Sequence, residues 1–86
     1  MTEHIVYKEV HLKEEVKTLK DIAKLYSTTT VKAYRILRAY YPEHHGAEAS
    51  DMEYTIILNG IPMPAFVFRH AKEAMDLYRE GKIKLS

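Results

Sequence analysis

Apolar residues recur at helical spacing in two neighbouring stretches of the chain, with a polar run between them. In the first stretch the apolar positions are Val16, Leu19, Ile22, Ala23 and Tyr26. In the second stretch they are Ala33, Ile36, Leu37 and Tyr40. Both sets keep the three- and four-residue steps that place side chains on one face of an α-helix. The pattern therefore predicts two amphipathic helices joined by a short turn.

The limits of the second helix are predicted from the residue types at its two ends. The polar run at residues 27–30, Ser-Thr-Thr-Thr, is poor helix interior. A threonine hydroxyl can, however, accept a hydrogen bond from a backbone N–H of the first helical turn. We therefore expect this helix to run from about Thr29 or Thr30 to Tyr41, where Pro42 should end it.

The residues before the turn predict a strand and then the first helix. Residues 5–10 alternate loosely between apolar and polar types and are rich in β-formers, which predicts a short strand. Glu14 suits the positive end of a helix dipole, so the first helix should begin near Lys13 or Glu14. It is expected either to continue to Tyr26 or to break near Thr18.

A second strong pattern lies in the later half of the chain. Residues 53–68 form two β-rich runs around Asn59 and Gly60. An Asn-Gly pair in this setting favours a two-residue type I′ hairpin, because both turn residues must take a positive φ. Pro62 and Pro64 lack N–H donors, so the second strand should lie at a sheet edge, at least in its first half.

A third helix is expected after the hairpin, from Arg69 or His70 to Glu80, with Gly81 ending it. Its apolar face would consist of Ala71, Ala74, Met75 and Tyr78. Residues 42–52 are predicted to form a polar loop. The predicted fold is a small α+β domain of residues 1–86, in the order β-α-α-β-β-α. Its parts are a pair of helices at about 14–41, a hairpin at about 53–68 and a last helix at about 70–80.

Composition narrows the class of protein and its expected location. The 86 residues suffice for one small domain, and the 47% of hydrophobic residues favours a folded chain. The absence of cysteine excludes disulfides and thiolate metal ligands. No apolar run approaches the ~18 residues of a membrane span, and the first residues lack the pattern of a secretory signal. These features predict a soluble, cytoplasmic protein without a membrane partner.

Charge is segregated along the chain, although the net charge is only +1. Five lysines or arginines and a single aspartate lie between residues 18 and 41. Four acidic residues, and no lysine or arginine, lie between residues 42 and 54. One basic face on a small protein is typical of phosphate contact. The alternative is an ordinary solvated helix surface, and the charge pattern alone favours neither.

Residues 18–37 resemble the helix-turn-helix of bacterial and phage transcription regulators. Ala23 would stand at the small position where the two helices cross, and residues 21–24 and 35–37 are similar to the signatures of the two helices. The buried apolar positions of the motif would be Ile22, Tyr26, Ala33 and Ile36. Ser27 departs from the pattern, because it occupies the turn position that glycine usually holds, and residues other than glycine rarely take φ > 0.

With the hairpin after the second helix, the chain is also similar to winged helix-turn-helix proteins of the excisionase-like phage and mobile-element group. The resemblance implies a DNA-binding regulator or recombination accessory factor whose second helix, residues 29–41, reads the major groove of double-stranded DNA. The residues expected to contact DNA are Thr29, Thr30, Val31, Lys32, Tyr34, Arg35, Arg38, Lys20 and Lys24. Arginine can donate two parallel hydrogen bonds to guanine, and lysine binds phosphates. The alternative is a solvated surface for Arg35 and Arg38, and side-chain packing for Tyr34.

The sequence gives weaker signals for a metal site or for catalysis. Glu43, His44 and His45, with Glu48 and Asp51 nearby, offer metal-ligating groups without the regular spacing of a metal site, so no metal is expected. The sequence shows no Gly-rich phosphate loop, nucleophile–base order or paired-carboxylate motif. This pattern favours a protein that is not an enzyme and needs no cofactor.

Seven tyrosines in 86 residues leave a second functional hypothesis open. Tyrosine is favoured at interfaces, although the simpler interpretation is a small core with tyrosines at its margin. In this alternative the chain is a protein-interaction module, such as a phage-encoded inhibitor of a host protein, that uses the 54–68 hairpin and surface tyrosines. A second copy of the chain or another protein would then bind the hairpin edge by strand addition, or would bury Met63 and Phe66.

Overall fold

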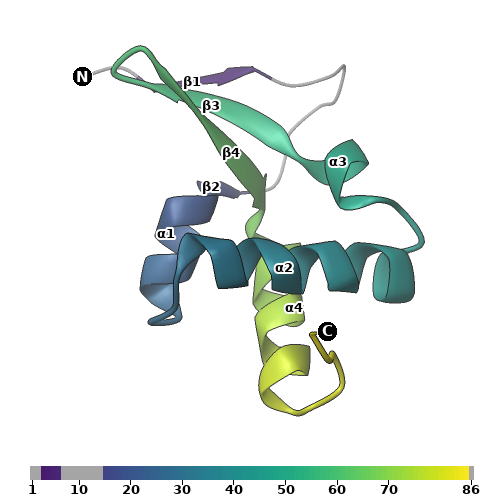
Figure 1. The fold of residues 1–86 in the computed structure, drawn as a ribbon. Coiled ribbons are helices and arrows are strands. Elements are labelled where there is room, and N and C mark those ends of the chain that lie inside the picture. The colour runs from purple at the N-terminus through teal and green to yellow at the C-terminus, as the bar shows by residue number, and fades with distance from the viewer. Residues whose placement is uncertain (1–2, 7–14, 86) are drawn as a thin grey trace.

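The fold is taken from a computed structural model of the chain, which describes residues 3–6 and 15–85. The described elements are, in chain order, β1 (Glu3–Val6), β2 (Val16–Thr18), α1 (Leu19–Leu25), α2 (Thr30–Tyr40), the π-helix η1 (Tyr41–His45), α3 (Ala49–Met52), β3 (Tyr54–Leu58), β4 (Ile61–Val67) and α4 (Phe68–Arg79) (Figure 1). The protein is a small α+β molecule with an antiparallel sheet, as predicted. Its element order differs from the predicted one, because β2, η1 and α3 are added.

The strands form an antiparallel sheet in the order β1-β3-β4-β2. Its central hairpin of β3 and β4 turns at Asn59 and Gly60, whose φ angles are 51° and 79°. Two positive φ values are those of a type I′ turn, so the predicted hairpin is confirmed. β1 pairs with β3 and covers the start of the strand predicted at residues 5–10. Residues 7–10 of that prediction lie outside the described residues.

The two prolines of β4 lie where the strand has a single neighbour. β2 pairs with residues 65–67 of β4, so residues 61–64 have β3 on one side and no other strand of the described residues on the opposite side. Pro62 and Pro64 lie in this open half, which confirms the prediction made from their missing N–H groups. Because they are two residues apart, their nitrogens face the same side of the strand.

Helix α1 begins later than the apolar spacing predicted. The predicted start near Lys13 or Glu14 lies outside the described residues, but the chain is not helical immediately before Thr18. Thr18 is the N-cap of α1, and its side-chain oxygen accepts a hydrogen bond from the Asp21 N–H at 3.1 Å. Residues 16–18 form β2, because they pair with the end of β4. Both alternatives expected helix before Thr18, and both are wrong for residues 15–18, because the helix begins only after the Thr18 N-cap.

Helix α2 begins as predicted but is not followed by a loop at Pro42. Thr29 is its N-cap, and its side-chain oxygen accepts a hydrogen bond from the Lys32 N–H at 3.1 Å. Pro42 lacks the N–H that α-helical bonding would need, yet the chain continues as the π-helix η1 until Gly46, which has a φ of 77°. A proline in the first turn of a helical segment has no N–H bond to lose. The prediction of a polar loop at 42–52 is wrong, since η1 and α3 occupy most of it.

Helix α4 starts directly at the end of β4, with no residue between them. The Phe68 N–H donates to the Glu15 carbonyl oxygen at 2.8 Å, which ties the start of α4 to the residue before β2. The helix ends at Arg79, close to the predicted Glu80, and Gly81 follows with a φ of 80°. The predicted apolar face is confirmed in the packed side chains of Ala71, Ala74, Met75 and Tyr78.

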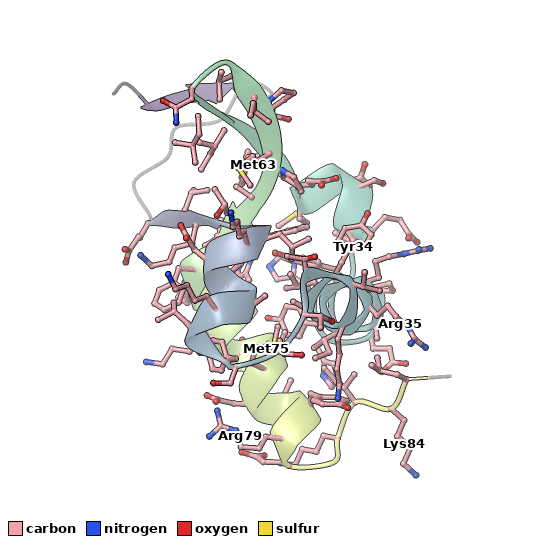
Figure 2. All side chains as sticks on the ribbon, turned by 60° about the vertical axis from the view of Figure 1, so that its left-hand side comes forward. Tyr34, Arg35, Met63, Met75, Arg79 and Lys84 are labelled. Atoms are coloured by element: carbon pink, nitrogen blue, oxygen red, sulfur yellow. The ribbon has the colours of Figure 1, made fainter. Side chains whose placement is uncertain are left out.

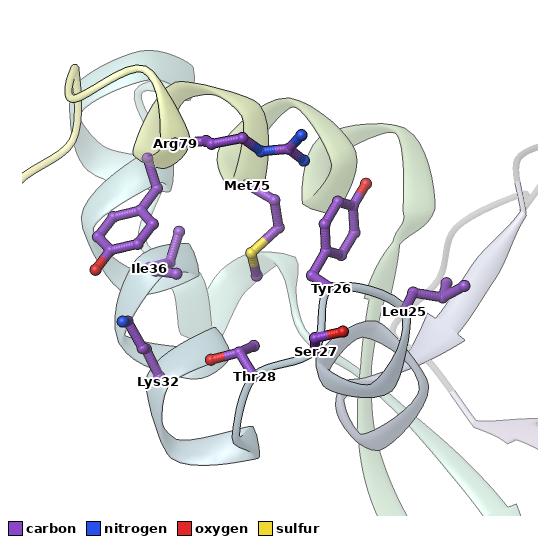
Figure 3. A pocket seen from close by; sticks show the side chains of 9 residues that line it. Leu25, Tyr26, Ser27, Thr28, Lys32, Ile36, Met75 and Arg79 are labelled. Atoms are coloured by element: carbon purple, nitrogen blue, oxygen red, sulfur yellow. The ribbon is translucent and has the colours of Figure 1, made fainter.

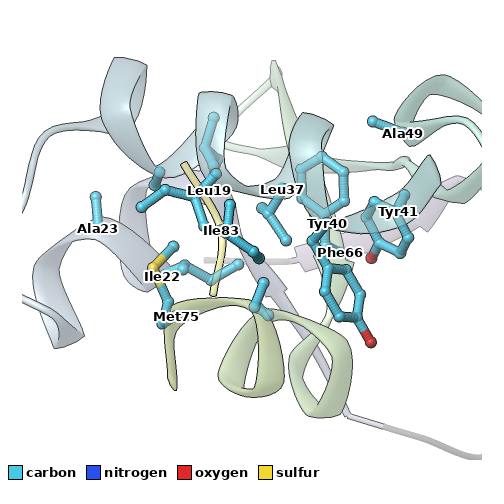
Figure 4. Packing of buried hydrophobic residues seen from close by; sticks show 14 residues of the cluster. Leu19, Ile22, Ala23, Leu37, Tyr40, Tyr41, Ala49, Phe66, Met75 and Ile83 are labelled. Carbon is cyan, nitrogen blue, oxygen red and sulfur yellow. The ribbon is translucent and has the colours of Figure 1, made fainter. Parts of the chain in front are cut away.

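The hydrophobic core lies where α1, α2 and α4 meet the end of β4 (Figure 4). The largest fully buried side chains of this cluster are Ile22, Ile36, Leu37, Tyr40, Tyr41, Phe66 and Ile83. Phe66 is the contribution of β4, and its ring lies 5.9 Å from the ring of Tyr41. Ile83 comes from the segment after α4, so the end of the described chain is also part of the core.

Candidate nucleic-acid interface

A four-residue turn connects α1 to α2. Ser27 has a φ of 53°, the left-handed conformation, at the position where the helix-turn-helix pattern has glycine. The N–H groups of Ser27 and Thr28 donate to the carbonyl oxygens of Lys24 and Ala23, at 3.3 Å and 2.9 Å. Ala23 and Ala33 are both buried, and their small side chains suit two helices that pack against each other. The departure at Ser27 therefore does not prevent the glycine-like turn geometry.

Replacing Ser27 with glycine is expected to stabilise the protein by up to about 1 kcal/mol. The left-handed conformation costs an L-residue about 1–2 kcal/mol, and the greater chain entropy that glycine loses on folding offsets part of the gain. Urea or thermal unfolding measures the change. Ser27→Ala is the control, because it removes the hydroxyl but keeps the backbone strain. A glycine variant less stable than the alanine variant would contradict the observed turn.

The outer side of α2 forms one wall of a groove of about 440 Å³, which we call the α2–hairpin groove. It is lined by Leu19, Thr30, Val31, Tyr34, Arg35, Arg38, Glu53 and Pro64. Five of the nine residues predicted to contact DNA are in this set. Val31 is 69% exposed, and Arg35 and Arg38 are also exposed. These five residues of the predicted contact face thus share one accessible surface.

Tyr34 connects an exposed cation of this groove to the core. The guanidinium carbon of Arg38 lies 5.8 Å from the centre of the Tyr34 ring. The ring of Tyr34 in turn lies 6.1 Å from that of the buried Phe66. A cation over an aromatic face is attracted by the ring and loses mobility. Tyr34 therefore packs at the margin of the core and at the same time positions Arg38 in the groove.

A second groove, of about 340 Å³, shares its two arginines with the first, and we call it the tail groove. It is lined by Arg35, Arg38, Ala39, Lys84 and Leu85. Three of these residues are cations and none is acidic. Figure 2 shows Arg35 and Lys84 on the same side of the molecule, whereas Arg79 projects from the other side. Sequence reasoning missed Lys84, because no local pattern places the last residues beside α2.

The remaining four predicted contact residues do not line the α2–hairpin groove. Thr29 serves as the N-cap of α2, and Lys20 is exposed on α1. The ammonium group of Lys32 lies 5.1 Å from the centre of the Tyr78 ring, at a pocket of about 450 Å³ between the turn and α4 (Figure 3). Lys24 lines a separate hollow with Lys17, Asp21 and Leu25. The nine predicted residues therefore do not form a single site.

The acidic segment after α2 reaches the α2–hairpin groove at one residue. Glu53 lines this groove together with Arg35 and Arg38. Glu48 precedes α3 and Asp51 lies within it, and both are exposed. Neither residue lines the α2–hairpin groove. The groove consequently keeps an excess of positive charge, although a smaller one than the tail groove.

A cluster of histidines and tyrosines joins the end of α2 and η1 to α4. The Nε2 atoms of His45 and His70 are 3.2 Å apart, and the Tyr40 hydroxyl donates to the Glu73 carboxylate at 2.9 Å. Burial, and then this hydrogen bond, raises the pKa of Tyr40 to about 12. Burial also raises the pKa of Tyr41 well above its usual range. Both tyrosines are neutral at physiological pH. Among the described residues, no group of three or more side chains is suited to hold a metal ion.

Within the described ranges, no helix combines the length and the apolar character that crossing a membrane requires. No protein family, curated protein or solved structure matches the chain. We therefore infer a function from the turn, the exposed face of α2 and the two grooves.

Proposed function

We propose that the protein binds double-stranded DNA as a winged helix-turn-helix, with α2 as the recognition helix and the β3–β4 hairpin as the wing. The observation that carries the proposal is the exposure of Arg35 and Arg38 on a helix that has no acidic residue and follows a left-handed turn. Its role would be that of a transcription regulator or recombination accessory factor, of phage or mobile-element type, acting in the cytoplasm without catalysis.

The proposed docking follows from the geometry of α2. The first half of a recognition helix faces base edges in the major groove, which is too narrow for more than one helix. Thr30 and Val31 would offer methyl groups to thymine, and Arg35 would donate two parallel hydrogen bonds to guanine O6 and N7. Arg38 lies about one turn further along the same face and rests on Tyr34. It would contact the phosphate backbone at the margin of the groove.

The competing proposal is a protein-interaction module, which is favoured by an apolar residue at the hairpin tip. Ile61 is 62% exposed there. The prediction that a partner would bury Phe66 is wrong, because Phe66 is already buried in the core, and every tyrosine of the described residues is buried or half-buried rather than exposed. A protein partner would contact such side chains rather than add a strand, because Pro62 and Pro64 leave the open half of β4 short of N–H donors. The segregated positive charge on α2 has no role in the interaction module. We therefore place the interaction module second to the DNA proposal.

Binding to duplex DNA is expected to weaken steeply as salt is added. If about four to six basic groups displace counterions, log K should fall with log[salt] at a slope near −4 to −5. Titration of a random-sequence duplex at several salt concentrations measures this slope. A protein that binds no duplex even at the lowest salt would remove the DNA proposal and leave the interaction module.

A further inference from the structure

The tail that follows α4 returns to α2 and is held there by a buried side chain. Gly81 takes a φ of 80° after the helix, and the Lys82 N–H donates to the Leu77 carbonyl oxygen at 2.8 Å. Ile83 is only 2% exposed and belongs to the core cluster (Figure 4). This anchor fixes the direction in which the next residue, Lys84, leaves the core. Lys84 is therefore held beside α2 by the fold of the tail.

The tail groove is lined by three cations and by no acidic residue. Arg35 and Arg38 reach it from α2 and Lys84 reaches it from the tail. Among the described residues Lys84 has no carboxylate partner, whereas the neighbouring Lys82 lies 3.2 Å from Glu80. Like charges held together repel, and a phosphate bound between Arg38 and Lys84 offsets the repulsion, which leaves Arg35 for the guanine contact. Lysine and arginine are the residues that bind phosphate in this way.

We propose that the tail groove holds a phosphate of the DNA backbone and that Lys84 is one of its contacts. The inference rests on the proposed function and adds a further contact, outside the helix-turn-helix, to the same surface. With α2 in the major groove, one of the two DNA strands that border this groove would lie against the tail, on the side where Arg35 and Lys84 project (Figure 2). Because phosphates carry no sequence information, Lys84 strengthens binding to all duplexes alike and helps to set the register of α2.

The test compares Lys84→Gln with Lys82→Gln in duplex binding at several salt concentrations. Lys84→Gln is expected to weaken binding to random and selected duplexes alike, by about five- to tenfold at 0.1 M salt, and to make the salt slope shallower by about 0.9. Lys82→Gln lowers the net charge equally and lies in the same tail, but its ammonium group pairs with Glu80, so affinity and slope should stay at the parent values. Lys84→Arg keeps the charge and should restore binding. Thermal unfolding of each variant verifies that the fold is unchanged.

The possible outcomes distinguish this inference from the proposed function. If the parent protein binds no duplex at any salt concentration, the proposed function fails, and the inference fails with it. If the parent binds duplex and the two glutamine variants have equal affinities and slopes, only the inference fails. Poly-glutamate serves as a probe for an acidic protein partner. Loss of poly-glutamate binding in Lys84→Gln, with duplex binding unchanged, would overturn the assignment of the groove to phosphate.

Discussion

Replacing Phe66 with alanine is expected to lower the free energy of unfolding by about 3–5 kcal/mol. Phe66 is fully buried at the end of β4, and its ring packs against those of Tyr34 and Tyr41. Alanine would leave a cavity among side chains from three elements, which cannot all move inward. Because a small domain has a total stability of about 5–15 kcal/mol, urea unfolding should show a much lower midpoint.

The other phenylalanine of the chain is the matched control. Phe68 is half-buried at the start of α4, and the Lys17 ammonium nitrogen lies 5.3 Å from the centre of its ring. Phe68→Ala removes the same atoms but from a partly solvated site, so the loss should be smaller, about 1–2 kcal/mol. Equal losses at the two positions would contradict the location of Phe66 at the centre of the packed rings.

Replacing Arg35 with alanine is expected to weaken binding to a selected DNA site by about 1–3 kcal/mol, or roughly 5- to 150-fold. Arg35 is exposed on α2 and lines both the α2–hairpin groove and the tail groove. Without the guanidinium group to read a base, the preference at one position of the site should also relax. The measurement is the affinity for a site recovered from a randomised duplex pool and for each of its single-base variants. The free energy of unfolding should change by less than ~0.5 kcal/mol, since the residue is outside the core.

Lys24→Ala provides the comparison for a cation that does not face the α2–hairpin groove. Lys24 lies on α1 beside Asp21 and Leu25, so its loss should weaken selected and random duplexes by the same small factor. If Arg35→Ala also weakens both duplexes equally, Arg35 contacts phosphate rather than a base. If Arg35→Ala leaves DNA affinity intact while Ile61→Ala abolishes activity in the cell, the hairpin tip is the functional surface and the interaction module replaces the DNA proposal.

The elements predicted best are those whose signals are local in the sequence. The N-cap hydrogen bond of Thr29 reaches only three residues ahead, and the hairpin turn depends on two adjacent residues, Asn59 and Gly60. Strand β2 has no such local signal. Val16 continues the apolar spacing of the following helix, and residues 16–18 are a strand only because they pair with residues 65–67, far away in the sequence. Helical spacing alone could not reveal that pairing with β4 outweighs helix formation at these residues.

The same distinction applies to the candidate site. Arg35 and Arg38 could be placed on one surface because they lie on the same helix, where spacing determines which side chains share a face. Lys84 could not be placed, since its location depends on the burial of Ile83 against helices formed much earlier in the chain. The position of Lys32 on the helix predicts a DNA contact, but the structure places its ammonium group beside Tyr78 of α4 instead.

Because β4 joins α4 directly, this part of the chain cannot gain or lose a residue without moving the helix. Val67 ends the strand and Phe68 begins the helix, so the pleat of β4 determines the rotational phase of α4. One residue inserted or deleted within the paired part of β4 would reverse the pleat at the junction and so turn the helix by roughly 180° about its axis. The face formed by Ala71, Ala74 and Met75 would then turn away from α2. An extra residue should instead be tolerated at the hairpin tip, between Leu58 and Ile61, where it leaves that phase untouched.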